Sequence, residues 1–378
     1  MAERIIDEHI GKLGYGNMRL PKTEDGKIDI ETINKMIDRY LESGYSYFDT
    51  AYIYQGSEDV LGECLVKRHP RESFNIATKM NLANVKSAEE MPIQIETSLK
   101  RLCTDYVDFY LIHGLTKETI KKANDFDAWG YLQKLKADGI ARHIGFSFHS
   151  TPEDLEEILA HHPEVEFVQL QINYLDWDNP KVQSRRLYEI ARKYDKLVSI
   201  MEPNKGGWLA GEKSEAGMML KKANPDASVA SWAFRYVLEL DGLLTVLSGM
   251  GNMTELEDNI KTFQNFKPLS KEEHALIDKA VDILNNTPSI PCTRCGYCFP
   301  NCPKNIMIPG YIGILNNYLI YKNIDPLQHI YFMLSGEGGQ AEDCIGCGAC
   351  ERNCPQHLEI SSLMRQVTDL VKNGEPAE

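Results

Sequence analysis

The chain has 378 residues, of which 43% are hydrophobic and 25% charged, and its formal net charge is −14. This acidic balance gives no electrostatic support for nucleic-acid binding, and no stretch reaches the roughly 18 uninterrupted apolar residues of a membrane span. The first six residues contain no apolar run of signal-peptide length, so we expect a cytoplasmic location.

Short apolar segments rich in β-formers alternate with longer amphipathic segments from about residue 10 to residue 265. Alternation of this kind implies a parallel sheet covered by helices. Eight such units over some 250 residues predict a (β/α)₈ barrel, which we place at 1–286. The competing doubly wound fold requires a glycine-rich fingerprint that Gly14-Tyr15-Gly16 does not complete. The predicted strands are Ile10–Tyr15, Tyr45–Phe48, Phe74–Thr78, Val107–Ile112, His143–Ser147, Val165–Leu170, Leu197–Met201 and Leu243–Leu247.

A second, smaller domain is predicted at 287–378. A helix over about 271–285 closes the barrel region, and Asn286 to Pro291 has the composition of a short linker. Ile308 to Leu334 is rich in Ile, Leu and Tyr at helical spacing, and Gly336 to Gly339 interrupts it. We therefore expect this domain to be mainly helical.

Eight of the ten cysteines form two copies of one motif, C-x-x-C-x-x-C-x-x-x-C-P, and the second copy follows the first by 52 residues. This run is the bacterial [4Fe–4S] ferredoxin signature. Zinc uses two ligand pairs and has no need of a third cysteine at the same interval, and disulfides suit secreted chains. In two-cluster ferredoxins the fourth cysteine of each motif binds the other cluster. The pattern predicts one cluster on Cys292, Cys295, Cys298 and Cys354, and another on Cys344, Cys347, Cys350 and Cys302.

Polar side chains follow three of the early predicted strands. Asp49 directly follows the second predicted strand, Lys79 the third and His113 the fourth, and Tyr54 lies shortly after Asp49. Active sites of barrels lie where the carboxyl ends of the strands meet, so these four residues can converge. A phenol titrates near about 10, and we expect the Lys79 ammonium to lower that pKa, with Asp49 orienting the lysine and His113 orienting a substrate oxygen. Each residue alone also has an ordinary structural interpretation.

These four residues, in Phe48-Asp49-Thr50-Ala51 and Leu111-Ile112-His113, resemble the catalytic tetrad of the aldo/keto reductases over about residues 8 to 285. With the cysteine motifs, the whole chain resembles the branch of that superfamily that carries a ferredoxin-like domain. The resemblance implies a nicotinamide cofactor whose carboxamide is bound by Ser147 and Gln169. It also implies that a loop leading into a helix holds the cofactor's phosphates and adenine. The residues matched to this loop are Ser248, Gly249, Gly251 and Asn259.

Three positions depart from the family pattern. Phe148 replaces the carboxamide-binding asparagine, Met201 replaces the aromatic residue that stacks on the nicotinamide, and Glu255 aligns approximately with the basic residue that pairs with the 2′-phosphate of NADPH. An acidic group at the last position disfavours NADPH. Met201 either fills space or leaves room for a wider ring.

The electron count adds a second cofactor hypothesis. Nicotinamide transfers two electrons as hydride, whereas a [4Fe–4S] cluster transfers one, and a flavin is the usual converter. We therefore expect NAD(P)H, FMN or both, with an FMN phosphate near Lys205, Gly206 or Gly207.

The sequence predicts an oxidoreductase that reduces a small carbonyl or oxidises an alcohol, with Tyr54 as the general acid/base. Its clusters are expected to exchange electrons with a partner protein. One alternative is a non-enzymatic electron carrier that uses the barrel as a scaffold, and a second is a regulatory subunit that senses the redox state of a bound nucleotide. The two remaining cysteines, Cys64 and Cys103, are interpreted as small core residues.

Overall fold

The computed structural model describes residues 12–23 and 25–376. The chain divides into two compact units. The first contains 1–203 and 233–269, and the second contains 204–232 and 270–378. The predicted domain limits, 1–286 and 287–378, stay predictions. The six N-terminal residues and the start of the first predicted strand, at Ile10, lie outside the described residues.

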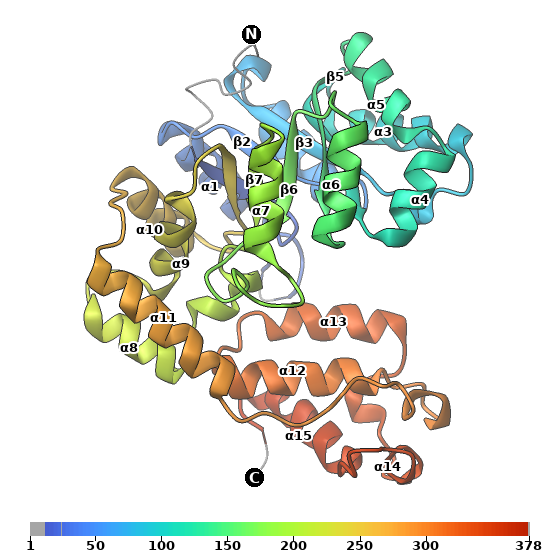
Figure 1. Cartoon of the computed structure of the whole chain (residues 1–378), viewed down its shortest axis with the longest axis vertical. Helices are drawn as coiled ribbons and strands as arrows, with labels where there is room; N and C mark the ends of the chain where they lie inside the picture. Colours follow the sequence, from blue (N-terminus) through green and yellow to red (C-terminus); the bar gives the residue numbers. More distant parts are fainter. Residues whose placement is uncertain (1–11, 24, 377–378) are drawn as a thin grey trace. The chain divides into compact units, whose positions relative to one another are not determined.

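The first unit is a closed barrel of eight parallel strands, in which each strand pairs with the next and β8 pairs with β1 (Figure 1). Buried strands of this type are rich in Val, Ile, Leu and Phe, which explains why the predicted positions agree closely with the observed ones. The strands are β1 Leu13–Gly16, β2 Tyr47–Asp49, β3 Asn75–Met80, β4 Val107–Leu115, β5 Ala141–Phe148, β6 Phe167–Gln171, β7 Leu197–Met201 and β8 Leu243–Ser248.

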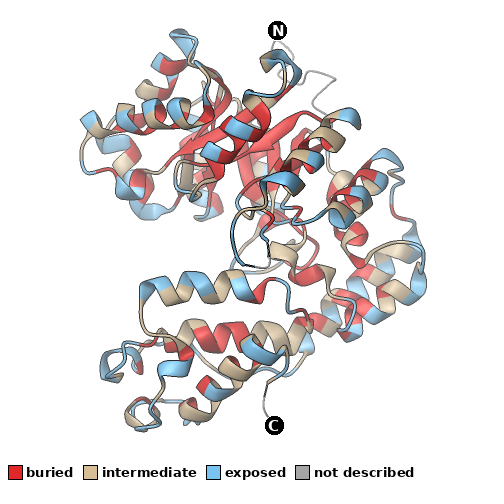
Figure 2. Ribbon diagram, turned by 180° about the vertical axis from the view of Figure 1, so that it is seen from behind, coloured by how far each residue is buried: buried red, intermediate tan, exposed pale blue. Residues whose placement is uncertain are grey.

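Helices surround the barrel and bury one face each, so their outer faces are exposed while the strands are buried (Figure 2). Local capping fixes several of the helix starts. Thr116 and Thr151, for example, each form a capping box at the first turn of α4 and α6. The helices are α1 Ile30–Glu42, α2 Ser57–Leu61, α3 Met91–Leu102, α4 Lys117–Asp125, α5 Ala128–Ala137, α6 Pro152–His161, α7 Ser184–Lys193, α9 Val229–Leu238 and α10 Met253–Gln264.

Side chains fill the interior of the barrel. Tyr47, Phe109 and Phe167 pack together with Leu111 and Leu244, and all five are almost fully buried. Gly145 is required at its position in β5, because a Cβ there would lie 2.6 Å from the Phe167 carbonyl oxygen. The barrel is therefore a packed core, and its chemistry lies at the strand ends.

The second unit is helical, as predicted for the C-terminal part of the chain. Ile308 to Leu334 forms two helices, because Lys322 takes a left-handed backbone conformation (φ 51°) and Pro326 precedes the next helix. Helix α12 packs against both α13 and α15 (Figure 1). The helices of this unit are α8 Glu215–Ala223, α11 Lys271–Asn286, α12 Ile308–Tyr321, α13 Leu327–Glu337, α14 Ala349–Arg352 and α15 Ile360–Asn373.

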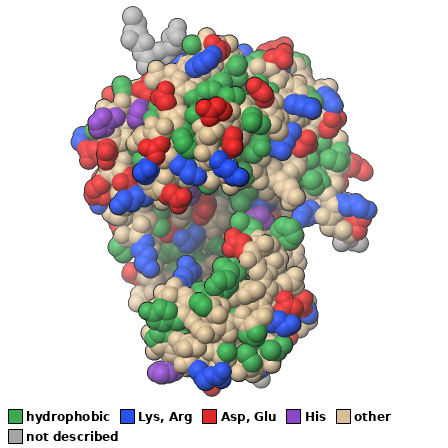
Figure 3. Space-filling view, turned by 90° about the vertical axis from the view of Figure 1, so that its right-hand side faces the viewer, with side chains coloured by type: hydrophobic (Ala, Val, Ile, Leu, Met, Phe, Trp, Pro, Cys, Tyr) green, Lys and Arg blue, Asp and Glu red, His purple; other side chains and the backbone are tan. Residues whose placement is uncertain are grey.

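No helix in the described ranges is long and apolar enough to cross a membrane. Acidic and basic side chains are interspersed over the face shown in Figure 3, so on that face the negative charge is not gathered in one patch.

Candidate functional site

An ion pair shielded from water lies at the carboxyl ends of β2 and β3. The Lys79 ammonium donates to Asp49 Oδ1 and to the Thr50 carbonyl oxygen, both at 2.6 Å. Lys79 is 0% exposed and Asp49 is 3% exposed. Burial raises the pKa of Asp49 and lowers the pKa of Lys79, and the attraction between the two charges opposes both shifts. The two hydrogen bonds of Lys79 hold the ion pair in one geometry.

Tyr54 and His113 complete the group that the sequence predicts. The Lys79 Nζ lies 5.2 Å from the centre of the Tyr54 ring, and the Tyr54 and His113 rings meet edge to face with centroids 5.6 Å apart. Both rings are half-buried. The Nδ1 of His113 is buried and has no hydrogen-bond partner among the described residues. The structure therefore brings Asp49, Tyr54, Lys79 and His113 together around one opening of the barrel.

The electrostatics of Tyr54 differ from the expectation that Lys79 lowers its pKa. Burial, followed by the charges of Asp49 and Glu202, raises the pKa of Tyr54 well above its ordinary value. The reason is that Asp49 lies against Lys79 and offsets its charge at the phenol. Burial and the neighbouring Lys79 lower the pKa of His113 to about 3. At neutral pH the site therefore holds a protonated phenol and a neutral imidazole.

A buried carboxylate, Glu58, supports this group and is not predicted from the sequence. Glu58 is 1% exposed, accepts a hydrogen bond from the Thr78 hydroxyl at 2.7 Å and pairs with Arg101 at 3.1 Å. Thr78 precedes Lys79 on β3, so Glu58 fixes the strand that carries the lysine. A single glutamate in a short helix has the pattern of a surface residue, and only the exposed fraction reveals its role.

Ser147 and Gln169 lie side by side at the ends of β5 and β6, in direct register. The Ser147 hydroxyl accepts from the backbone N–H of Gly114 at 2.7 Å, and the Gln169 amide donates to the Met201 sulfur at 3.6 Å. The Gln169 Oε1 atom is buried without a hydrogen-bond partner among the described residues. A carboxamide N–H is a suitable donor for that oxygen, so these residues fit a nicotinamide ring.

The loop after β8 leads into α10 as the resemblance implies. Asn259 donates to the Ser248 hydroxyl at 2.9 Å, which brings these two predicted residues together. Glu255 folds back over the start of α10 and accepts from the backbone N–H of Gly251 at 2.7 Å. A carboxylate at a helix N-terminus occupies the kind of position that suits phosphate, so Glu255 opposes a phosphate there.

Lys205, Gly206 and Gly207 belong to the second unit and form a tight turn after β7. All three have a left-handed backbone, with φ of 49°, 66° and 99°. The Gly207 N–H donates to the Asn204 carbonyl at 2.9 Å, and the Gly207 carbonyl accepts from Asn323 at 2.8 Å. Because both polar groups of Gly207 are used inside the unit, this glycine does not fit the expected phosphate cradle for FMN.

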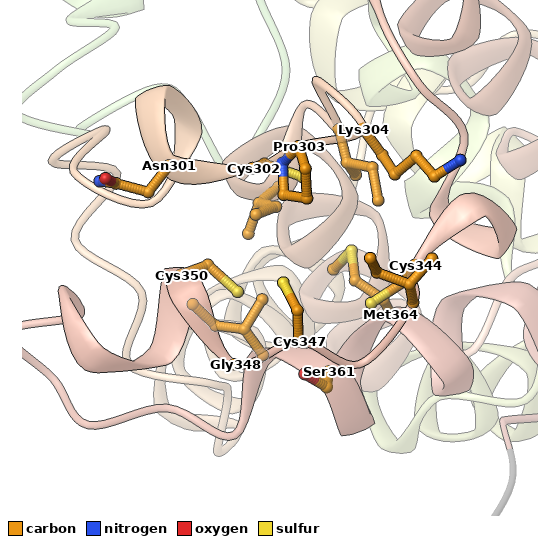
Figure 4. Close-up of a pocket in the computed structure, with 14 residues that line it drawn as sticks. Asn301, Cys302, Pro303, Lys304, Cys344, Cys347, Gly348, Cys350, Ser361 and Met364 are labelled. Carbon is orange, nitrogen blue, oxygen red and sulfur yellow. The ribbon is translucent and has the colours of Figure 1, made fainter.

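The eight motif cysteines line two pockets, four in each. One pocket is lined by Cys302 with Cys344, Cys347 and Cys350, and Figure 4 shows Cys302 on one side of it and the other three opposite. The second pocket is lined by Cys292, Cys295, Cys298 and Cys354. These sets match the predicted exchange of the fourth cysteine between motifs. Each pocket also has an apolar wall, to which Ile360 contributes in both.

The positions of these thiols bear on whether each pocket suits a single zinc ion or an iron–sulfur cluster. In the described part of the chain, no three His, Cys, Asp or Glu side chains converge tightly enough for one metal ion. A zinc ion needs four ligands at about 2.0–2.3 Å, whereas each thiolate of a cubane binds a different iron. Four motif cysteines around each pocket are the number of thiolates that a cubane cluster needs.

Of the two remaining cysteines, Cys64 is buried, as predicted. The prediction for Cys103 is wrong, because it is exposed and ends α3 in a left-handed conformation (φ 53°).

Comparison with known proteins identifies both parts of the chain. The model of the aldo/keto reductase family matches residues 12–282, and that of a 4Fe-4S dicluster domain matches 291–358. The chain belongs to the aldo/keto reductase family. It is an oxidoreductase whose barrel is followed by a helical 4Fe-4S dicluster domain, which confirms the predicted family branch and fold class.

Individual relatives resemble the barrel at moderate identity. An aldo-keto reductase of Mycolicibacterium smegmatis is 27% identical over 63% of this chain and 79% of its own length. The uncharacterized oxidoreductase YqkF of Bacillus subtilis is 25% identical over 71% of this chain and 91% of its own length. Among solved structures, the holo form of the aldo-keto reductase AKR11C1 from Bacillus halodurans is 25% identical, with a TM-score of 0.58 over 71% of this chain and 91% of that chain. An aldo-keto reductase from Klebsiella pneumoniae in complex with NADPH is 20% identical, with a TM-score of 0.58 over 71% of this chain and 90% of that chain, a likeness that shows the fold alone.

Proposed function

We propose that this aldo/keto reductase family member reduces a small carbonyl compound, or oxidises the corresponding alcohol, at the mouth of the barrel. The observation that carries the proposal is the convergence of Tyr54, Lys79, Asp49 and His113, with Lys79 fully buried and paired. A scaffold retained only to carry electrons has no use for a buried ammonium beside a phenol. This favours the enzyme over the electron carrier.

The roles of the four residues follow from their protonation states. Tyr54 is a protonated phenol at neutral pH and donates its proton to the carbonyl oxygen as the carbon is reduced. Neutral His113 has a ring N–H that can bind and orient the same oxygen. Lys79 stabilises the phenolate left after proton transfer, and Asp49 keeps the lysine in place. In the oxidation direction the same proton returns to Tyr54.

A nicotinamide dinucleotide, when bound, supplies or accepts the hydride. In the proposal Ser147 and Gln169 hold its carboxamide, and Ser248, Gly249, Gly251 and Asn259 line the path of its phosphates and adenine. The orphaned Gln169 oxygen supports the first assignment. The placement of Glu255 on Gly251 supports NADH over NADPH.

In the dicluster domain we assign one cluster to Cys292, Cys295, Cys298 and Cys354 and the other to Cys344, Cys347, Cys350 and Cys302, since these sets line two separate pockets. Such clusters pass one electron at a time and suit exchange with a redox partner protein. A flavin would convert between one-electron and two-electron transfer, and we propose it from the electron count alone. The protein is proposed to act in the cytoplasm.

Replacement of Tyr54 by Phe tests the proposal, because it removes the proton donor and leaves the ring in place. We expect turnover of a carbonyl substrate to fall by about 10²–10⁴-fold. Binding of the nicotinamide nucleotide and reduction of the clusters by dithionite should be unchanged. Full carbonyl turnover by the Tyr54→Phe variant would exclude Tyr54 as the acid.

Acid release of cofactors from anaerobically purified protein tests the flavin. The proposal expects about one free flavin per chain in the visible spectrum of the supernatant. A flavin-free supernatant from protein with full iron content would rule that cofactor out and leave the carbonyl chemistry unaffected.

A further inference from the structure

The loop after β7 is fastened to the dicluster domain by contacts that lie within the second unit. This loop comprises Lys205–Gly211, which follows Met201 at the end of the strand. Asn323, just beyond α12, donates from Nδ2 to the Gly207 carbonyl at 2.8 Å. Asn323 is 8% exposed, so the bond is shielded from water. Its Oδ1 accepts from the Asp325 N–H at 3.2 Å, which fixes the orientation of the amide.

Packing adds to this hydrogen bond. The Trp208 ring lies on the Tyr321 ring at the end of α12, with centroids 5.7 Å apart and planes 30° apart, and Trp208 is 5% exposed. The approach is close enough to require glycine at position 211, where a Cβ would lie 2.8 Å from the Tyr321 carbonyl oxygen. Three contacts therefore hold the loop against one end of α12: the hydrogen bond from Asn323, the ring contact of Trp208 and the close approach of Gly211.

The other end of α12 lies at the cluster pockets. Ile308 lines the pocket of Cys302 and Cys344, and Pro309 and Ile312 line the pocket of Cys292 and Cys354. An α-helix of 14 residues is about 21 Å long and rigid over that length. One helix thus joins the walls of both cluster pockets to the loop.

The chain is strained where it enters the loop, from Glu202 to Lys205. Glu202 and Lys205 are non-glycine residues with φ of 55° and 49°. Such conformations persist only where the surroundings hold them. The Glu202 carbonyl is held by Asn173 at 3.2 Å, and the loop beyond Lys205 is held by Asn323 and Tyr321. If the loop were released, the segment Glu202–Lys205 could relax to an unstrained conformation. Met201 directly precedes this segment at the end of β7, so the relaxation would act on the nicotinamide site.

We propose that Asn323, with Tyr321, is a positioning residue through which the dicluster domain sets the conformation of the loop Lys205–Gly211 and thereby the affinity of the nicotinamide site at the end of β7. The inference rests on the proposed function for the nicotinamide site. Whether Asn323 restrains the loop is a separate question, and hydrogen exchange of the loop amides can answer it without any bound cofactor. Asn323 touches no reacting atom in this scheme, so its effect falls on binding and leaves the proton transfer at Tyr54 unchanged.

Asn323→Asp is the sharpest variant, because the aspartate keeps the oxygen that accepts from Asp325 and replaces only the donor. A carboxylate oxygen then faces the Gly207 carbonyl and repels it. The matched control is Asn316→Asp within α12. Asn316 donates to the Ile290 carbonyl at 2.9 Å and accepts from the Ile290 N–H at 2.7 Å, so it fixes the linker, and within the described part of the chain its side chain forms no hydrogen bond to the loop.

The experiment uses the anaerobically purified full chain with its clusters. We expect Asn323→Asp to raise the KM and Kd for NADH about tenfold, with kcat at saturation and iron content unchanged. Hydrogen exchange of the amides of 204–211 should become faster. Asn316→Asp should leave NADH affinity and the exchange of this loop as in the parent.

Two other outcomes separate the inference from the proposed function. If the parent protein binds NADH and Asn323→Asp binds it equally well, with unchanged exchange of the loop, the inference is overturned. If the parent binds no nicotinamide nucleotide, the proposed function fails, and exchange of the loop alone decides whether Asn323 holds it. Trp208→Leu removes the ring contact from the loop side and should act in the same direction if Asn323→Asp does not accumulate as folded protein.

Discussion

At the scale of single residues, the barrel mouth depends on charges that are kept from water. Asp49 and Lys79 stabilise each other only as a pair, since either one alone would be a buried charge without a partner. The sequence predicts all four residues of this group, because each follows a strand that is easy to find. It does not predict Glu58, since nothing in its local pattern distinguishes it from a surface acid, nor the exposure of Cys103, which results from a helix end.

Asp49→Asn tests the pair. The amide keeps the shape and removes the charge, which leaves the Lys79 ammonium buried and unpaired. We expect the free energy of unfolding to fall by about 3 kcal/mol and turnover to fall with it. Chemical denaturation measures the first quantity. Glu31→Gln, which breaks the exposed pair with Lys35, is the control and should change stability little. Equal effects of the two substitutions on the free energy of unfolding would show that the buried pair stabilises the protein no more than the exposed pair.

The pH dependence of stability follows from His113. Its folded pKa of about 3 lies below the unfolded value of about 6.5, so the unfolded chain takes up a proton first as the pH falls. Its contribution therefore lowers stability progressively from about pH 6.5 towards pH 3. His113→Asn should remove that part of the slope, which melting curves at several pH values can measure. His161→Asn, at the exposed end of α6, should give a curve parallel to the parent. A parallel curve for His113→Asn would contradict the assignment.

Nucleotide preference follows from Glu255. Glu255→Lys removes the carboxylate from the Gly251 N–H and places an ammonium near the start of α10. We expect NADPH affinity to rise by about tenfold relative to NADH, since a phosphate gains an opposite charge in place of a like one. Comparison of the two dissociation constants in parent and variant checks this. An unchanged ratio of the two dissociation constants would show that the 2′-phosphate of NADPH does not bind near residue 255.

At the scale of elements, hydrophobic periodicity predicts the eight strands and most helices, because each strand is buried on both faces and each helix on one. The same pattern does not show that Ile308 to Leu334 forms two helices. The break depends on a left-handed Lys322 and on Pro326, which interrupt the backbone without changing the apolar composition. Nor does it show that the segment 204–232 joins the second unit, because that depends on contacts between distant residues such as Asn323 and Gly207.

Gly62 lies where its helical turn comes very close to α3. It begins a π-helical turn, Gly62–Val66, and a Cβ there would lie 2.2 Å from the Arg101 carbonyl oxygen in α3. Gly62→Ala should lower the free energy of unfolding by about 2–4 kcal/mol, because a backbone atom has to move. Denaturant titration measures the change. Gly336→Ala, in open space within α13, is the comparison and should be neutral or slightly stabilising. A neutral Gly62→Ala would contradict the close approach.

At the scale of the whole molecule, the chain combines a barrel suited to two-electron chemistry with a domain suited to one-electron transfer. Cys302 lines the pocket of the second motif's cysteines and Cys354 lines that of the first, so the proposed exchange of the fourth ligand would interlock the two pockets. The sequence predicts this exchange from spacing alone, since a three-cysteine turn leaves one iron for a ligand from the other motif.

Cys302→Ser distinguishes the two ligand sets. The substitution should alter the cluster held by Cys344, Cys347 and Cys350 and leave the cluster of its own motif intact. Electron paramagnetic resonance of the dithionite-reduced protein, with Cys354→Ser as the reciprocal variant, can assign the signals. Loss of the same signal in both variants would contradict the exchange.

The most direct measurement of the central claim is a count of redox cofactors per chain in anaerobically purified protein. Iron, acid-labile sulfide, flavin and nicotinamide nucleotide would be determined on one sample of known protein concentration. We expect about eight iron and eight sulfide per chain, together with an organic carrier of two electrons that binds at the barrel. Zinc in place of iron, or a full set of clusters in a protein that binds neither nicotinamide nor flavin, would contradict it.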